Sequence, residues 1–157
     1  MTRRIVFVCT GNICRSPTAE GVLRHKVAAL GLPADHFVIA SAGTGDWHVG
    51  DPPDPRSQAH ARRRGVEIGA QRAQQFTRRD FDRFDLVIAM DDSHHDSLRA
   101  LCPPDQRHKL RRAGDFSSLV PAGGVPDPYY GGEHEFEHVL DLVEAVCEGV
   151  LAELNAK

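Results

Sequence analysis

Val8-Cys9-Thr10-Gly11-Asn12-Ile13-Cys14-Arg15-Ser16-Pro17 is the stretch that decides the fold of this chain. A short β-branched and aromatic run precedes it, and apolar residues at helical spacing follow it, namely Ala19, Val22, Leu23, Val27 and Leu30. The stretch is therefore expected to be a turn between a strand and a helix. We expect Ser16 to cap the helix and Pro17 to take its first position. The unpaired backbone N–H groups at such a helix start attract anions.

The side chains of this turn suit a phosphate-binding loop that performs covalent chemistry. Cys9 is expected where loop amides, a helix N-terminus and Arg15 stabilise a thiolate, so its pKa should lie below the ordinary value. Arg15 follows Cys9 by six positions, and its planar guanidinium can donate to two phosphoryl oxygens when the loop curls around them. Ser16 could donate a hydrogen bond to the sulfur. The intervening loop residues are candidates for substrate binding: Thr10, Gly11, Asn12, Ile13 and Cys14.

A second strand and the loop after it supply a candidate wall for the same site. Residues 37–40 are predicted to form a buried strand that ends at Ser41. Two strands joined by a helix run parallel in nearly all cases, so the ends at Cys9 and Ser41 should lie at one edge of the sheet. Trp47 lies in the Gly- and Pro-rich loop that follows. Its ring is expected to line the site, where it could stack on a phenyl ring, rather than only to anchor the loop.

A later loop, Val125-Pro126-Asp127-Pro128-Tyr129-Tyr130, is the second element with functional potential. Asp127 is held between two prolines that limit the freedom of the loop, and two tyrosines follow directly. An acid beside aromatic surface is therefore expected here. An ordinary surface turn is the alternative interpretation.

These motifs resemble those of the low-molecular-weight protein tyrosine phosphatases, whose loop is Cys-x5-Arg-Ser/Thr near the N-terminus. The resemblance covers essentially the whole chain, through residues 8–20, 41–44, 46–47, 54–56, 84–91 and 127–130. It implies hydrolysis of protein phosphotyrosine through a phosphocysteine intermediate, with Cys9 as nucleophile, Arg15 binding phosphate and Asp127 as general acid and base. It also implies that Trp47, with Tyr129 and Tyr130, walls the cleft. No metal or other cofactor is expected.

The chain departs from the usual family pattern at two positions. It has Gln74 where the family usually has arginine, and His94 where it usually has asparagine. Neither position belongs to the catalytic set of the family. Because His94 and His95 are adjacent on a predicted helix, they point in different directions, so we expect them to be exposed rather than to bind a metal.

The remaining pattern predicts one α/β domain over residues 1–157. Its three layers should contain a four-stranded parallel sheet with helices on both faces and the phosphate-binding loop after the first strand. Further expected elements are a short helix near 77–80, a buried strand at 85–90, a helix capped by Asp91 or Asp92, a weak strand at 107–110 and a long packing helix at 133–155.

The sequence leaves three other function classes to consider. His134-Glu135-Phe136-Glu137-His138 matches the H-E-x-x-H zinc-protease pattern, yet no spacing signals the third ligand that such a site needs. A phosphotyrosine-binding module without turnover would lack the nucleophile or the acid, and Cys9 and Asp127 are both present. An arsenate reductase would need further redox cysteines near the third strand, where Cys102 stands alone.

The composition of the chain limits which partners it can bind and in which compartment it is expected. The chain has 41% hydrophobic and 26% charged residues and a net charge of −3, which argues against general nucleic-acid binding. No apolar run approaches the roughly 20 residues of a membrane span, and no signal peptide is evident. Four cysteines without a paired framework favour a reducing compartment. We expect a cytoplasmic protein, monomeric or weakly dimeric, that acts on phosphotyrosine-containing proteins.

Cys14 lies five positions after Cys9 and should come near it when the loop curls around phosphate. An accessible thiolate oxidises to sulfenic acid, and a neighbouring thiol can trap that species as a disulfide. We therefore expect Cys14 to act as a resolving cysteine. The alternative is that it only packs beneath the loop.

Overall fold

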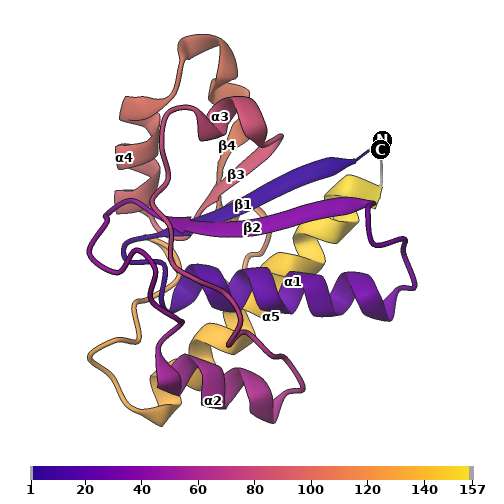
Figure 1. Ribbon diagram of the computed structural model, residues 1–157, viewed down its shortest axis with the longest axis vertical. Coiled ribbons are helices and arrows are strands. Elements are labelled where there is room, and N and C mark those ends of the chain that lie inside the picture. The colour runs from indigo at the N-terminus through magenta and orange to yellow at the C-terminus, as the bar shows by residue number, and fades with distance from the viewer. Residues whose placement is uncertain (1, 156–157) are drawn as a thin grey trace.

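Four parallel strands form the central sheet, in the order β2-β1-β3-β4 (Figure 1). The computed structural model describes residues 2–155. The strands are β1 (Arg3–Cys9), β2 (Phe37–Gly43), β3 (Leu86–Ala89) and β4 (Leu110–Arg112). Val8 of β1 pairs with Ala42 of β2 and with Ala89 of β3, so the carboxyl ends of the three strands lie at one edge. This edge carries the turn that follows Cys9.

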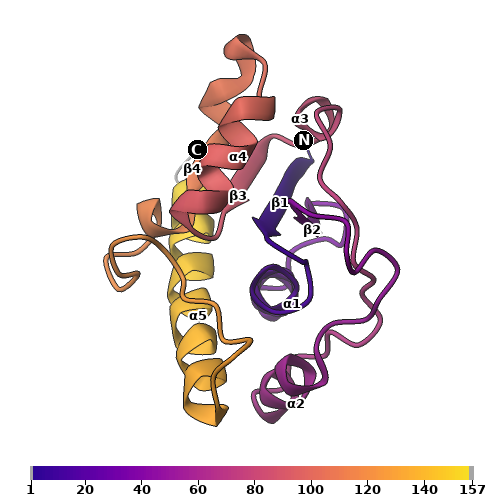
Figure 2. The same cartoon turned by 90° about the vertical axis from the view of Figure 1, so that its left-hand side faces the viewer.

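Helices cover both faces of the sheet and complete the three predicted layers (Figures 1 and 2). One face is covered by α1 (Arg15–Ala29) and α5 (Glu133–Asn155), with α2 (Pro55–Arg63) packed against α5. The other face carries α3 (Asp80–Arg83) and α4 (Asp92–Leu101). Side chains of β1 alternate between the two cores: Ile5 and Phe7 face α1 and α5, whereas Val6 and Val8 face α4.

The predicted elements are present, and their bounds differ at the start of α1, which is described below, and at one edge of the sheet. The long helix over residues 133–155 and the Asp91 cap of α4 are as expected. Residues 107–110 were expected to form the fourth strand, but residues 104–109 form the 3-10 helix η1 and the strand follows at 110–112. Pro104 starts this helical turn, because its fixed φ suits a first helical position. A second 3-10 turn, η2 (Ala113–Asp115), follows β4.

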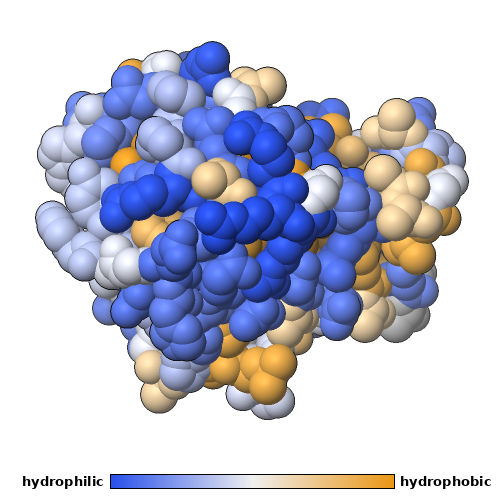
Figure 3. Space-filling model, turned by 90° about the horizontal axis from the view of Figure 1, so that it is seen from below, coloured by the Kyte–Doolittle hydropathy of each residue, from blue (hydrophilic) through white to orange (hydrophobic). Residues whose placement is uncertain are grey.

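The face formed by α2 and the start of α5 is predominantly hydrophilic (Figure 3). Arg64 lies between the two helices and contacts three carboxylates of α5, those of Glu137 at 2.7 Å, Asp141 at 3.0 Å and Glu144 at 3.2 Å. Arg62 pairs with Glu67 at 3.1 Å. These arginines are matched by acids of the same surface. Among residues 2–155 no helix has the length and apolar composition needed to cross a bilayer.

Candidate active site

The turn after β1 folds back so that its far end reaches the sulfur of Cys9. The Ser16 hydroxyl lies 2.9 Å from Cys9 Sγ, and the Ser16 amide donates to the same sulfur at 3.5 Å. Helix α1 begins at Arg15, with Cys14 at the cap position and no side-chain cap. The predicted Ser16 cap was therefore wrong. The hydroxyl is used on the sulfur, and Pro17 takes the third helical position, where its missing N–H still needs no partner.

The side chain of Asn12 fixes the turn by hydrogen bonds. Its φ of 58° lies in the left-handed region, which asparagine tolerates better than most residues. The side-chain amide donates to Ser16 Oγ at 2.8 Å and to Ser41 Oγ at 2.9 Å, and its oxygen accepts from the Gln74 amide at 3.0 Å. This side chain is buried and does not line the cleft. Any contact of Asn12 with substrate therefore falls to its backbone.

A chain of hydrogen bonds continues from Asn12 into the body of the domain. Ser41 Oγ donates to Glu20 Oε1 at 2.8 Å, and Arg24 pairs with the other Glu20 oxygen at 3.0 Å. Gln74, one of the departures from the family pattern, also donates from its side chain to the Ser41 carbonyl at 3.0 Å. Ser41, Glu20 and Gln74 thus support the loop without lining the cleft. The sequence placed Ser41 at the right edge of the sheet but gave no sign of these contacts.

Arg15 is almost fully buried, at 3% exposure, and its guanidinium contacts residues from two distant segments. One terminal nitrogen, NH1, donates to Asp91 Oδ2 at 2.8 Å and to the Val125 carbonyl at 3.0 Å. The other, NH2, lies 3.4 Å from His94 Nε2 and 3.6 Å from Asp127 Oδ2. The cation is therefore fixed before any anion binds.

Asp91 performs two tasks with its two oxygens. Oδ1 caps α4 by accepting from the His94 amide at 3.0 Å, and Oδ2 pairs with Arg15. Partial burial raises the pKa of Asp91, but hydrogen bonds from Ser93, from the His94 amide and from Arg15 outweigh it. The net pKa lies below the ordinary value, so the Asp91 carboxylate is charged at neutral pH. Sequence reasoning found the cap and missed the contact with Arg15.

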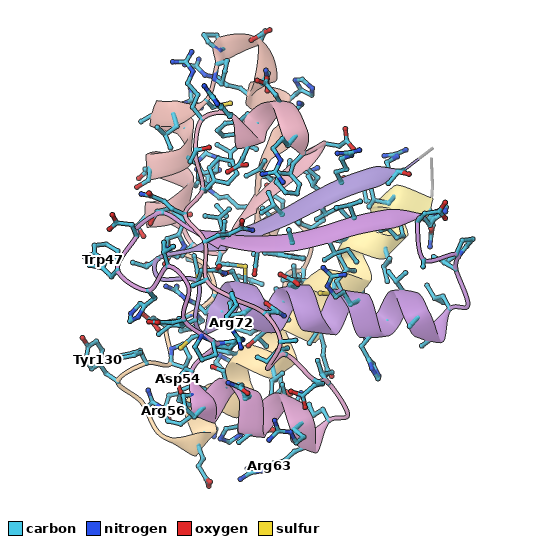
Figure 4. All side chains as sticks on the ribbon, viewed as in Figure 1. Trp47, Asp54, Arg56, Arg63, Arg72 and Tyr130 are labelled. Carbon is cyan, nitrogen blue, oxygen red and sulfur yellow. The ribbon has the colours of Figure 1, made fainter. Side chains whose placement is uncertain are left out.

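A cleft of about 250 Å³ opens above the loop, and most of the predicted site residues line it. The predicted ones are Cys9, Thr10, Gly11, Ile13, Cys14, Arg15, Trp47, Asp127, Tyr129 and Tyr130. Trp47 and Tyr130 project from two different loops on the same side of the molecule, and in this view Asp54 and Arg56 lie nearer to Tyr130 than to Trp47 (Figure 4). The two aromatic side chains are 71% and 95% exposed. Ser16, like Asn12, is buried beneath the cleft.

His48 and Arg56 are two further residues at or near the cleft. His48, which also lines the cleft, was not predicted, although it is adjacent to Trp47 in the sequence. The guanidinium of Arg56 lies 5.3 Å from the centre of the Tyr129 ring, and Arg56 also pairs with Asp54 at 2.9 Å. Burial raises the pKa of Asp54, but the hydrogen bonds from Arg56 lower it by more than burial raises it. The net pKa is therefore below the ordinary value.

Cys14 lines the cleft but is a buried thiol. Burial raises its pKa to about 12, although a hydrogen bond with Ser57 acts in the opposite direction. Cys14 is therefore protonated at neutral pH in this conformation. Its role as a resolving cysteine stays a prediction, and trapping a sulfenic acid would require the loss of that proton.

The expectation that His94 and His95 are exposed was wrong, because both are buried at 2% and 8% exposure. His134 and His138, by contrast, are exposed on α5, and Glu135 accepts a hydrogen bond from the Gly132 amide at 2.8 Å. Within residues 2–155 no group of three or more metal-ligating side chains is arranged to hold a metal ion.

Comparisons with known proteins agree in covering nearly the whole chain. A family model described as low molecular weight phosphotyrosine protein phosphatase matches residues 4–157. A low molecular weight protein-tyrosine-phosphatase of Streptomyces coelicolor is 47% identical, over 97% of this chain and 93% of that protein. The crystal structure of a protein tyrosine phosphatase from Entamoeba histolytica, with Hepes in the active site, has a TM-score of 0.93 at 34% identity and covers 98% of this chain and 97% of that one. The structure of YfkJ from Bacillus subtilis gives 0.91 at 37% identity, over 99% and 96%.

Substitution of Asn12 tests whether its side chain holds the loop. Asn12→Ala should lower the free energy of unfolding by about 2–4 kcal/mol, because three buried partners lose their bonds and alanine disfavours a positive φ. Asn12→Gly removes the same bonds but accepts the backbone, so it should recover roughly 1 kcal/mol of that loss. Urea unfolding measures both values, with Asn155→Ala at the exposed end of α5 as the control. Equal losses for the alanine and glycine variants would show that the positive φ carries no cost.

Proposed function

The chain belongs to the low molecular weight phosphotyrosine protein phosphatase family, and we propose that it hydrolyses protein phosphotyrosine through a phosphocysteine intermediate. The observation that carries this mechanism is the convergence of Cys9, Arg15 and Asp127 on one cleft. A nucleophile, a fixed cation and an acid lie together there, and these groups suffice for phosphoryl transfer that is driven mainly by positioning and charge.

In the first step, the Cys9 thiolate attacks phosphorus in line with the bond to the tyrosyl oxygen. The S–P bond forms and the P–O bond breaks, while Arg15 and the loop amides stabilise the equatorial oxygens. Asp127 transfers its proton to the leaving phenolate, whose parent phenol has a pKa of about 10. The hydrogen bond of 2.9 Å between Ser16 and Cys9 supports this step by stabilising the thiolate.

In the second step, Asp127 acts as the base. Its carboxylate takes a proton from water, the water oxygen attacks phosphorus, and the S–P bond breaks to release phosphate and regenerate the thiolate. The position of Asp127 supports both steps. Its side chain is about half exposed, Oδ1 accepts from the Tyr129 amide at 3.1 Å, and Oδ2 lies 3.6 Å from Arg15. The acid is thus tethered between the phosphate site and the aromatic wall.

The walls of the cleft favour tyrosine as the phosphorylated side chain. Trp47, Tyr129 and Tyr130 would surround a ring placed between the phosphate site and the peptide backbone. A phosphoserine lacks that ring and would bring the peptide backbone against these side chains before its phosphate reached Arg15. The proposed substrates are therefore phosphotyrosine-containing proteins.

Peptides test the proposed substrate class. Phosphate should be released from a phosphotyrosine peptide with a kcat/KM at least about 100-fold higher than from a phosphoserine peptide of the same sequence, because only the former places a ring against the aromatic walls. A chelator should leave the rate unchanged. Phosphate release and peptide length are measured in the same reaction. Chelator-sensitive peptide cleavage, or equal rates on both peptides, would overturn the proposal.

Replacement of the nucleophile tests the covalent step. Cys9→Ser should lose turnover on the order of 10⁴-fold or more, since a serine hydroxyl at neutral pH is a poor nucleophile for phosphorus, while inorganic phosphate still binds. Rapid quenching of the wild-type reaction should trap phosphate on Cys9. Cys102→Ser is the control, because Cys102 is also buried but lies outside the cleft. Substantial turnover by Cys9→Ser would contradict a phosphocysteine intermediate.

The acid role of Asp127 predicts a dependence on the leaving group. Asp127→Asn should slow phosphotyrosine hydrolysis by about 10²- to 10⁴-fold, because the phenolate then leaves without a proton. An aryl phosphate with a much more acidic phenol should lose far less in the formation of the intermediate. Single-turnover rates on the two esters measure the difference. Equal losses would remove Asp127 from this role.

A further inference from the structure

His94 lies behind the phosphate-binding loop, in the first turn of α4, and contacts both ends of the loop. Its Nε2 atom is 2.8 Å from Thr10 Oγ1 and 3.4 Å from Arg15 NH2. Thr10 directly follows the nucleophile, and Arg15 is the last residue before the Ser16 contact with the sulfur. A single ring nitrogen therefore joins the two residues that flank the curled turn.

The hydrogen bonds of Arg15 show what this contact does. A guanidinium has five N–H donors in one plane. The two on NH1 go to Asp91 and to the Val125 carbonyl, and one on NH2 goes to His94. The N–H of Nε and one hydrogen of NH2 then have no hydrogen-bond partner among the described residues, although Asp127 Oδ2 lies 3.6 Å from NH2. A guanidinium with donors left on Nε and NH2 can bind two oxygens of a phosphoryl group side by side.

The identity of the partners fixes the position of the proton on His94. Arginine can only donate, so the contact with Arg15 requires a lone pair on Nε2, and the Thr10 hydroxyl must then donate to the same nitrogen. The proton is left on Nδ1. Nδ1 lies 3.1 Å from Asp91 Oδ1, a contact without hydrogen-bond geometry but with the carboxylate charge that favours an N–H on that side. The contact with Arg15 therefore assigns the tautomer, and the charge of Asp91 is compatible with it.

His94 must also be neutral for this arrangement. Burial is the main effect that lowers the pKa of His94, the Arg15 guanidinium acts in the same direction, and the carboxylates of Asp91 and Asp127 oppose both; the resulting pKa is about 4. A second proton would occupy Nε2 and direct an N–H at the N–H groups of Arg15. At neutral pH the ring is an acceptor toward the loop.

We propose that His94 is a positioning residue for the phosphatase reaction, which sets the rotation of the Arg15 guanidinium so that its remaining N–H donors can reach the phosphoryl group. The inference rests on the proposed function for the reaction that it serves. In this proposal the buried lone pair on His94 Nε2 orients both the Arg15 guanidinium and the Thr10 hydroxyl. His94 touches neither the substrate nor the reacting atoms, and it acts through Arg15.

Two substitutions separate an acceptor from a space-filling side chain. His94→Leu has a similar volume and no acceptor, so kcat/KM for a phosphotyrosine peptide should fall about 10- to 100-fold, as for the loss of a hydrogen bond to a charged group. The dissociation constant of inorganic phosphate should rise in the same direction. His94→Gln places an amide oxygen near the position of Nε2 and should keep both values within about 3-fold of the wild type.

His95→Leu is the matched control, because His95 is the adjacent buried histidine of α4 and has no contact with Arg15. Its kinetics should be unchanged, and urea unfolding should show that all three variants are folded under assay conditions. Equal losses in His94→Leu and His94→Gln would reduce His94 to a packing residue and overturn the inference. Wild-type kinetics in His94→Leu would overturn it as well.

Nitrogen NMR of the wild type gives a readout that does not depend on turnover. The ring of His94 should carry its proton on Nδ1 at pH 7 and remain neutral until the pH approaches about 4. A proton on Nε2 at neutral pH would overturn the inference even in an active phosphatase. If the wild type failed to hydrolyse phosphotyrosine while His94→Leu weakened phosphate binding, the proposed function would fall and the orientation of Arg15 by His94 would stand.

Discussion

The structure depends on the burial of one positive charge, that of Arg15. Removing a guanidinium from water is unfavourable by several kcal/mol unless its N–H groups are paired. Here the pairing comes from Asp91 and from the carbonyl of Val125, which lie 76 and 110 positions away in the sequence. Arg15 can therefore be accommodated only when β3, the start of α4 and the loop that carries Asp127 are all in place. The cation makes the active site a product of the whole fold rather than of the loop alone.

The groups that bind the Asn12 side chain are uncharged, so they do not reduce the attraction of the loop for anions. The bonds made by Asn12 are to the Ser16 and Ser41 hydroxyls and to a backbone amide, all neutral partners. The nearest acid in this network, Glu20, is turned toward Ser41 and Arg24. A carboxylate aimed at the loop amides would compete with phosphate for the same donors. Hydrogen bonds to uncharged partners hold the loop in place. The N–H donors of Arg15 and of the loop that have no partner in the protein remain oriented for the oxygens of the substrate.

What could be predicted from the sequence was set by short-range pattern, and what was missed was set by tertiary contacts. The order strand, turn and helix around Cys9, the parallel sheet and the loop with Asp127 follow from spacing, turn chemistry and family resemblance. Ser16 does not cap α1 because its hydroxyl contacts the sulfur of Cys9 instead, and the helix begins without a side-chain cap. His94 and His95 do diverge, as adjacent helical residues must. Both directions are nevertheless buried, because α4 begins beneath the loop on one side and beside η2 on the other, and no sequence periodicity records this.

The zinc-protease motif at the start of α5 has no third metal ligand among residues 2–155. Phe136 is buried, and positions two residues away on either side lie about 200° around the helix, so His134 and His138 face solvent. Glu137, between them in the motif, pairs with Arg64 at 2.7 Å and with His60, and it thereby joins α5 to α2. A ligand pair on an exposed face could bind zinc only with a third side chain brought over it, and the neighbouring side chains of α2 are already engaged with the carboxylates of α5. Phe136 and Glu137 of this motif therefore serve the packing of the two helices, and α5 begins directly after the loop that carries Asp127.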